Sequence, residues 1–327
     1  MTASSVLSRP YFHNVAAAYD HMEKVLWSGD PICPHCGTLG NATKLQGKAT
    51  RPGLWKCKER ICRKQFTVTV GTVFESRHIP LPKMLQAVYL MSCSKKGVSA
   101  HQLHRILGVT YKTAWFLAHR IREAMRDGTL APMGGGGIVE AEETYFGPQE
   151  DPQPSPKRKG RPFTKGGKTG PAGKRAVVAL VERGGRVRSF HPAQADGKSV
   201  SKIVADNIDR EARLMTDESR LYIGPGKWFA SHETVTHSHG EYVRYTKERV
   251  IHTNTIEGFF SIFKRGMKGV YQHCSEKHLH RYLAEFDFRY NNRSALGVED
   301  VERTRNALRG VVGKRLTYRN PHVTAVE

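Results

Sequence analysis

Two closely spaced pairs of cysteines near the N-terminus constrain the fold of this chain more than any other feature. Two residues lie between Cys33 and Cys36, four lie between Cys57 and Cys62, and twenty residues separate the pairs. Such pairs on tight turns supply the four thiolates of a tetrahedral, structural Zn²⁺ site. A zinc ribbon is therefore predicted over residues 29–76. Two alternatives remain: His35 replaces one of the cysteines, or all four are free and buried.

Charge limits the partners that such a chain can have. Lysine and arginine number 52 against 30 aspartates and glutamates, a formal net charge of +22. This excess is typical of proteins that bind a polyanion, and double-stranded DNA is the partner we expect. The sequence contains no apolar run of about 18 residues, the length needed to span a membrane. Residues 1–20 lack the apolar core of a signal peptide. We therefore expect a cytoplasmic protein whose six cysteines bind metal or pack in a core.

Helical periodicity flanks the ribbon. Residues 1–28 are predicted to form a helical lead-in, and residues 77–130 a DNA-binding domain. Within the latter, Ser99–Met125 has the pattern of a helix-turn-helix, with a turn near Gly108 and a second helix that Thr110 caps. An ordinary helical hairpin has the same pattern and stays an alternative. If the motif binds DNA, five side chains of the second helix are expected to face the DNA: Tyr111, Lys112, Trp115, His119 and Arg122.

A glycine-rich linker, Met133–Gly137, precedes a region in which strands and helices alternate. Gly184 and Gly185 indicate a hairpin turn between two of the strands. Residues 138–295 are therefore predicted to form one mixed α/β domain, followed by a C-terminal tail at 296–327. Strands are predicted at 138–145, 175–182, 186–191 and 213–216, and helices at about 197–211 and along the apolar stripes that contain Phe260 and Leu283.

Residues 152–175 form a basic arm, rich in proline and glycine and almost without acids. Such a segment can track the phosphates of DNA, in which case the affinity for DNA should fall steeply with salt. The side chains that we expect to contact phosphates are Lys157, Arg158, Lys159 and Arg161.

Acidic residues occupy positions in residues 138–295 where they could meet. Glu140 and Glu142 share one face of the first strand, because alternate residues do, and Asp217 directly follows a later strand. Glu257 lies on the polar face of a helix, and Lys264 is two turns further along that face. Carboxylates from two strands and a helix can hold two Mg²⁺ or Mn²⁺ ions that assist phosphoryl transfer. Lys264 would then bind a DNA phosphate beside them.

Each of these acids also has an ordinary structural interpretation. Asn254 and Glu257, three residues apart, match a helix-capping pair. Asp217 can close a turn, and Glu142 can be a solvated strand residue. His232 and His237, between Asp217 and Glu257 in the sequence, could approach the acids, but a place at the surface or in the core is the expectation.

Several segments in succession resemble bacterial insertion-sequence transposases of the DDE type, in the branch with an N-terminal zinc ribbon. The resemblance extends from about Pro31 to Arg293, and the ordered series is specific although each segment alone is weak. The segments are Trp55-Lys-Cys, Gln65-Phe-Thr-Val, Gly71-Thr-Val-Phe-Glu75, Ser94-Lys-Lys-Gly-Val-Ser99, Tyr111-Lys-Thr-Ala-Trp115, Glu143-Thr-Tyr145, His252-Thr-Asn-Thr-Ile-Glu-Gly258 and Phe263-Lys-Arg-Gly266.

The resemblance implies an RNase H-like catalytic domain, catalytic Mg²⁺ or Mn²⁺, and a dimer or larger assembly on DNA in the bacterial nucleoid. It implies Asp217 as the second catalytic acid, Asn254 or Glu257 as the third residue, and Lys264 as the lysine of the family. The first acid falls on Glu142, where the family has Asp. The extra methylene moves the carboxylate by roughly 1.5 Å, and Mg²⁺ demands near-ideal octahedral geometry.

Three functions are consistent with these features. The first is a transposase that binds the terminal inverted repeats of its element, cleaves the DNA there and joins the 3′ ends to target DNA. The second is a catalytically impaired relative that acts as a sequence-specific DNA-binding protein or repressor, which Glu142 favours. The third is a zinc-ribbon protein of RNA metabolism, which would bind RNA more strongly than duplex DNA.

Overall fold

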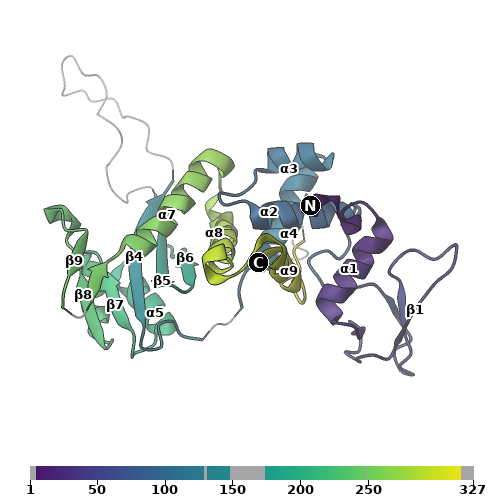
Figure 1. The fold of residues 1–327 in the computed structure, drawn as a ribbon, viewed down its shortest axis with the longest axis horizontal. Helices are drawn as coiled ribbons and strands as arrows, with labels where there is room; N and C mark the ends of the chain where they lie inside the picture. Colours follow the sequence, from purple (N-terminus) through teal and green to yellow (C-terminus); the bar gives the residue numbers. More distant parts are fainter. Residues whose placement is uncertain (1–4, 129–130, 148–173, 248, 318–327) are drawn as a thin grey trace, which may run out of the picture. The chain divides into compact units, whose positions relative to one another are not determined.

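The computed structural model describes residues 5–128, 131–147, 174–247 and 249–317, and the chain folds into two compact units (Figure 1). The N-terminal unit comprises Met1–Asp127 together with Asn292–Glu327. The second, which we call the sheet unit, comprises Gly128–Asn291. None of the described helices is long and apolar enough to cross a membrane.

The N-terminal unit begins with a helix and a small antiparallel sheet of three very short strands. The helix is fastened to the sheet by Trp55, whose indole nitrogen donates a 2.9 Å hydrogen bond to the carboxylate of Glu23. Gly53 has a φ of +72°, and a Cβ there would lie 2.1 Å from the ring of Tyr19. The helix therefore packs directly on the ribbon. These elements are α1 (Val15–Trp27), β1 (Ala42–Lys44), β2 (Trp55–Cys57) and β3 (Gln65–Phe66).

Four further helices complete this unit: α2 (Leu81–Cys93), α3 (Ala100–Leu107), α4 (Tyr111–Met125) and α9 (Asp300–Arg309). Gly108, at a φ of +58°, ends α3, and the hydroxyl of Thr110 caps α4 by accepting from the amide of Thr113 at 3.2 Å. The turn and the cap agree with the predicted pattern. The segment predicted as a C-terminal tail differs, because it contains α9, which packs against α1, α2 and α4. Its sequence contains few apolar residues, so it lacks the apolar stripe that indicates a buried helix.

The sheet unit is built on a five-stranded mixed sheet in the order β6-β5-β4-β7-β8. β5 pairs antiparallel with β4 and β6, whereas β7 is parallel to both β4 and β8. The predicted strands at 175–182 and 213–216 coincide with β5 and β7, while β8 was not predicted. The strands are β4 (Ile138–Phe146), β5 (Arg175–Glu182), β6 (Val187–Phe190), β7 (Arg213–Thr216) and β8 (Ser231–Thr234).

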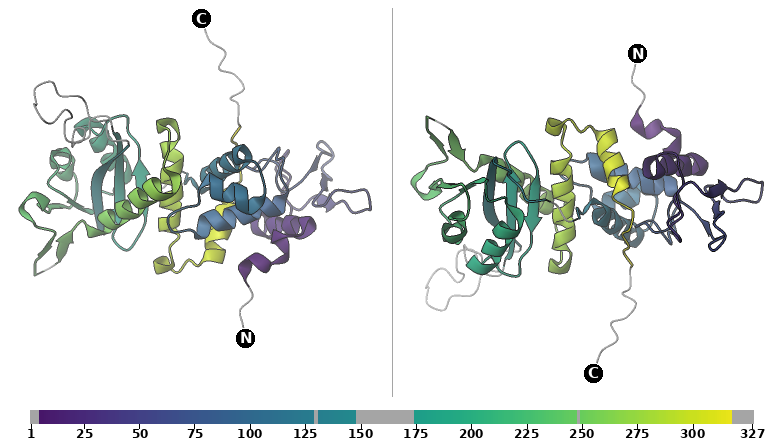
Figure 2. Two further views of the ribbon diagram at one scale, coloured as in Figure 1. Left: turned by 90° about the horizontal axis from the view of Figure 1, so that it is seen from above. Right: turned by 90° about the horizontal axis from the view of Figure 1, so that it is seen from below.

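Helices cover both faces of this sheet (Figures 1 and 2). α5 (Gly197–Asn207) covers one face, and α7 (Asn254–Gly266) and α8 (Glu276–Asn291) cover the other. Successive residues of β5 alternate between the two cores: Val178 packs with α5, and Val177 with α7. A mixed sheet between helices fits the RNase H-like fold that the resemblance implied. Short elements link these parts: α6 (Ile223–Gly226), β9 (Val243–Tyr245) and β10 (Val250–His252).

Candidate functional site

The four cysteines of the ribbon meet at one point. The sulfur atoms of Cys33 and Cys62 are 3.8 Å apart, those of Cys36 and Cys57 are 3.7 Å apart, and all four lie within 4.8 Å of one another. Sulfurs held at 2.3 Å from one zinc ion would be separated by roughly 3.8 Å. The quartet therefore has the dimensions of a structural zinc site, and His35 does not belong to it.

The protonation of these thiols depends on their surroundings. Burial raises the pKa of Cys57 to about 12, whereas hydrogen bonding with Thr38 lowers the pKa of Cys36 to about 6. Zinc binds thiolates, so a bound ion would hold all four sulfurs deprotonated. A filled four-sulfur site has no open position for a substrate, and its role is structural.

Helix α4 does not present all five predicted side chains to solvent. Tyr111 and Lys112 are exposed and Trp115 is half-buried, but His119 and Arg122 are only 1% and 2% exposed. The expectation that His119 and Arg122 face outward is therefore wrong. Every fourth residue of an α-helix is rotated by about 40° relative to the one before, so the row that starts at Tyr111 has turned into the buried face by His119.

The residues of the basic arm that are expected to contact phosphates lie outside the described residues: Lys157, Arg158, Lys159 and Arg161. Their contact with DNA stays a prediction.

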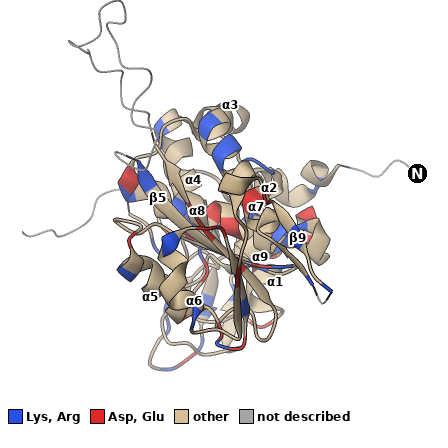
Figure 3. Ribbon diagram, turned by 90° about the vertical axis from the view of Figure 1, so that its left-hand side faces the viewer, with Lys and Arg blue, Asp and Glu red and all other residues tan. Residues whose placement is uncertain are grey.

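The acids of the sheet unit come from three elements that the sheet brings together. Glu142 lies on β4, Asp217 follows the parallel neighbour β7, and Glu257 lies on α7. Figure 3 colours all described aspartates and glutamates red and all described lysines and arginines blue. Asp217, Glu257 and Lys264, which is two turns along α7, each act electrostatically on Glu142. Residues separated by up to 122 positions in the sequence therefore come close enough in the sheet unit to affect the charge of Glu142.

Burial and electrostatic repulsion change the pKa values of the acids in this cluster. Burial, followed by repulsion from Asp217 and Glu257, raises the pKa of Glu142 to about 8, while Lys264 opposes the shift. Burial likewise raises the pKa of Asp217. Carboxyl groups with raised pKa values beside a lysine are typical of sites that bind a cation or move a proton.

Glu257 is held by two neighbours. Its carboxylate lies 3.1 Å from Nε2 of His237 and accepts a 3.2 Å hydrogen bond from the hydroxyl of Thr253. Thr253, the residue before α7, is fully buried. Asn254 is exposed and does not cap the helix, so the interpretation of Asn254 and Glu257 as a capping pair is wrong.

The N-terminus of α7 is instead capped by Glu140, a residue of β4 that sequence reasoning placed in the cluster without a role. Its side chain is fully buried and accepts hydrogen bonds from the hydroxyl of Thr255 at 2.8 Å and the amide of Ile256 at 3.0 Å. Arg183 donates to the same carboxylate at 2.9 and 3.0 Å and also binds the carbonyl of His252 at 3.0 Å. Glu140 thus ties α7, and with it Glu257, to the strand that carries Glu142.

Glu143, on the other face of β4, likewise holds a neighbouring segment in place. Its carboxylate accepts a 2.9 Å hydrogen bond from the hydroxyl of Ser219, whose amide donates to Asp217 at 3.0 Å. The residue after Glu142 therefore holds the loop that presents Asp217. The sequence shows three acids close together on one strand, but only the contacts reveal that two of them position the partners of the third.

The donor set of the cluster fits a hard divalent cation, because Mg²⁺ and Mn²⁺ prefer carboxylate oxygens. A cation would also relieve the repulsion that raises the pKa of Glu142. Within the described part of the chain, only the cysteine quartet gathers three or more ligand atoms closely enough to hold an ion as it stands. The carboxylate of Glu257 is directed to His237 instead.

A zinc ribbon together with an RNase H-like domain that clusters three acids defines a class of DNA-processing enzyme. Residues 135–291 match the family model of the ISXO2-like transposase domain, and residues 14–65 match the transposase zinc-ribbon domain. The chain belongs to the insertion-sequence transposases of the DDE type with an N-terminal zinc ribbon. The ribbon match includes α1, in agreement with its packing on the ribbon. No curated protein matched the chain.

The raised pKa of Glu142 predicts how stability depends on pH when no Mg²⁺ or Mn²⁺ is added. The folded chain holds the proton of Glu142 up to about pH 8, whereas the unfolded chain loses it near 4.5. Folding is therefore favoured at low pH, and this contribution is lost as the pH rises through 8. Thermal unfolding of the sheet unit from pH 5 to 9 should show a falling midpoint.

The Glu142→Gln variant is the control for this measurement, because its side chain is neutral at every pH. Its midpoint should decline less than that of the wild type above pH 6, and Mn²⁺ should stabilise the wild type most at high pH. Equal pH profiles for the two proteins would show that Glu142 does not titrate in this range.

Proposed function

We propose that this transposase binds the terminal inverted repeats of its insertion sequence and catalyses metal-dependent strand cleavage and strand transfer. One observation carries the catalytic part: carboxyl groups from the end of β7 and from α7 lie close enough to Glu142 on β4 that their repulsion, added to burial, raises its pKa to about 8. Glu140, by contrast, is paired with Arg183.

The residues have distinct roles in this proposal. Glu142, Asp217 and Glu257 hold Mg²⁺ or Mn²⁺, which supplies Lewis-acid activation of the attacking and leaving oxygens. Lys264 binds a DNA phosphate beside the acids. His237 holds Glu257 in place before the cation binds. Because Asn254 is exposed and lacks such a contact, we prefer Glu257 as the third acid.

We assign recognition of the element ends to residues 29–76 and 77–130, and the chemistry to residues 138–295. The zinc-ribbon and transposase domains imply DNA binding. We propose that Tyr111 and Lys112 of α4 contribute to it, together with the basic arm at 152–175. Because a transposition reaction joins two element ends, we propose that the active form on DNA is a dimer or a larger assembly.

A strand-transfer assay with Mg²⁺ or Mn²⁺ tests the catalytic proposal, and Glu142→Asp is its most informative variant. Restoring the residue type of the family should raise the rate, by about tenfold or more if misplacement of the carboxylate by one methylene costs 1.4 kcal/mol or more of transition-state stabilisation. Asp217→Asn should abolish activity in both backgrounds.

The remaining outcomes separate the alternatives. Specific binding of duplex DNA without nicking, even by Glu142→Asp, would overturn the catalytic proposal and leave a DNA-binding protein. Stronger binding to RNA than to duplex DNA would contradict the role in element-end recognition.

A further inference from the structure

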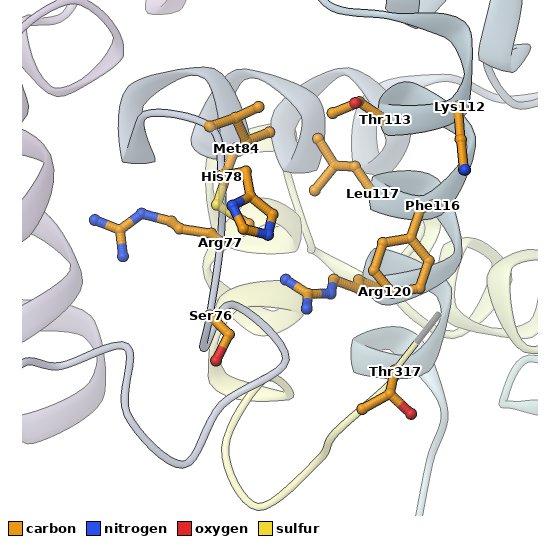
Figure 4. Close-up of a pocket in the computed structure, with 11 residues that line it drawn as sticks. Ser76, Arg77, His78, Met84, Lys112, Thr113, Phe116, Leu117, Arg120 and Thr317 are labelled. Carbon is orange, nitrogen blue, oxygen red and sulfur yellow. The ribbon is translucent and has the colours of Figure 1, made fainter. Parts of the chain in front are cut away.

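A cavity of about 350 Å³ lies within the N-terminal unit, beside α4 (Figure 4). The loop at 76–79 and α2 form one side, α4 forms the other, and Thr317 lies at the edge. The proposed function assigns no role to this cavity. Its lining includes the cationic side chains Arg77, Lys112 and Arg120, together with His78, but no aspartate or glutamate.

Arg120 is the unusual member of this lining. Its guanidinium stacks on the ring of Phe116 at 4.8 Å and extends toward His78 in Figure 4. Its Nε is buried without a hydrogen-bond partner, and among the described residues it forms no ion pair. Burial, and then the nearby charge of Arg315, lowers the pKa of Arg120.

Arg77 shows what a structural arginine looks like in the same lining. Its guanidinium donates to the hydroxyl of Thr69 at 3.1 Å and of Tyr19 at 2.5 Å. Arg120 has no such contacts, and a half-buried cation without a partner is destabilising. An anion that enters the cavity would offset that cost.

The position of the cavity on α4 indicates what this anion is. Lys112, Phe116 and Arg120 are four residues apart, so they form one row along the helix. This row lines the cavity, whereas the adjacent row from Tyr111 becomes buried at His119. The side of α4 that remains available to a ligand is therefore displaced by one residue from the side expected from the sequence.

We propose that this cavity binds a backbone phosphate of DNA, which receives two hydrogen bonds from Arg120 and further positive charge from Lys112. The guanidinium fork matches two phosphate oxygens, and stacking on Phe116 holds the fork in place. The inference rests on the proposed function, because it assumes that the N-terminal unit binds DNA. It specifies which side of α4 faces the DNA backbone.

The test is the salt dependence of DNA binding by the full chain, measured by fluorescence anisotropy on a labelled duplex with the terminal sequence of the element. Arg120→Gln should reduce the slope of log Kd against log salt by about one, because one phosphate contact is lost. Arg309→Gln is the matched control. It removes the same charge from the same unit, but Arg309 already pairs with Glu302 at 3.1 Å, so the slope should not change.

A second measurement distinguishes binding from a structural role. Because no described residue forms an ion pair with Arg120, Arg120→Gln should unfold at the same temperature as the wild type or higher when no DNA is present. A duplex with single methylphosphonate linkages should contain one position that weakens wild-type binding but not binding by Arg120→Gln.

The possible results test the proposed function and the phosphate site separately. A wild-type chain that does not bind duplex DNA would overturn the proposed function. Wild-type binding with an unchanged salt slope in Arg120→Gln would overturn this inference alone, as would a lower unfolding temperature without an effect on binding. Inorganic phosphate that stabilises the wild type as strongly as the duplex does would identify a site for the free anion and not for DNA.

Discussion

Removal of zinc should unfold the ribbon at residues 29–76 and leave the sheet unit folded. Apart from Cys33 and Cys57 themselves, the buried core of the ribbon around the metal site is Phe66 with a few half-buried neighbours, and its strands contain only two or three residues. This cluster alone is too small to offset the conformational entropy of the segment between Cys33 and Phe66. Structural zinc supplies about 10–16 kcal/mol in comparable peptides.

Hydrogen exchange measured with and without a zinc chelator provides the test. Amides of β1, β2 and β3 should lose their protection when zinc is removed, and the C-terminal end of α1 should loosen because Trp55 anchors it through Glu23. Cys57→Ser should reproduce the effect, whereas Cys93→Ser, outside the quartet, should not. Retained protection in the chelated protein would contradict a structural role of the metal.

Glu140→Gln should destabilise the sheet unit by about 3–5 kcal/mol, the usual cost of removing one partner of a buried ion pair. The substitution preserves the shape of the side chain but removes the charge that faces Arg183, whose side chain is 23% exposed. It also weakens the acceptor for the first turn of α7. Chemical denaturation gives the stability, and hydrogen exchange at residues 254–258 reports the loosening of α7.

Glu233→Gln is the matched control for this prediction. Glu233 pairs with Arg249 at 2.8 Å in the same unit, but both side chains are partly exposed, so its loss should cost less than about 1 kcal/mol. If Glu140→Gln costs no more than this, Glu140 does not anchor α7. If α7 loosens while strand transfer keeps its rate, the attachment of α7 to β4 does not position Glu257 for the reaction.

Local patterns in the sequence predicted local structure well. β5 and β7 have the expected bounds because each is an apolar run between turn residues, and Gly108 and Thr110 mark the end of α3 and the start of α4 through their own backbone and side-chain chemistry. α9 escaped detection because its sequence contains few apolar residues. Its burial depends on α2, which is distant in the sequence.

For the sites, the chain itself determined which groups are present: four cysteines at ribbon spacing, and carboxylates at strand ends and on a helix. The tertiary structure alone decided their environments. It brought the sulfurs to the spacing of a zinc tetrahedron, placed Glu142 where Asp217 and Glu257 repel it, made Glu140 the cap of a helix 115 residues away, and buried His119 while leaving Arg120 beside a cavity. The physical reason is that pKa values, capping across elements and exposure depend on distances through space, which the spacing of residues along a chain does not specify.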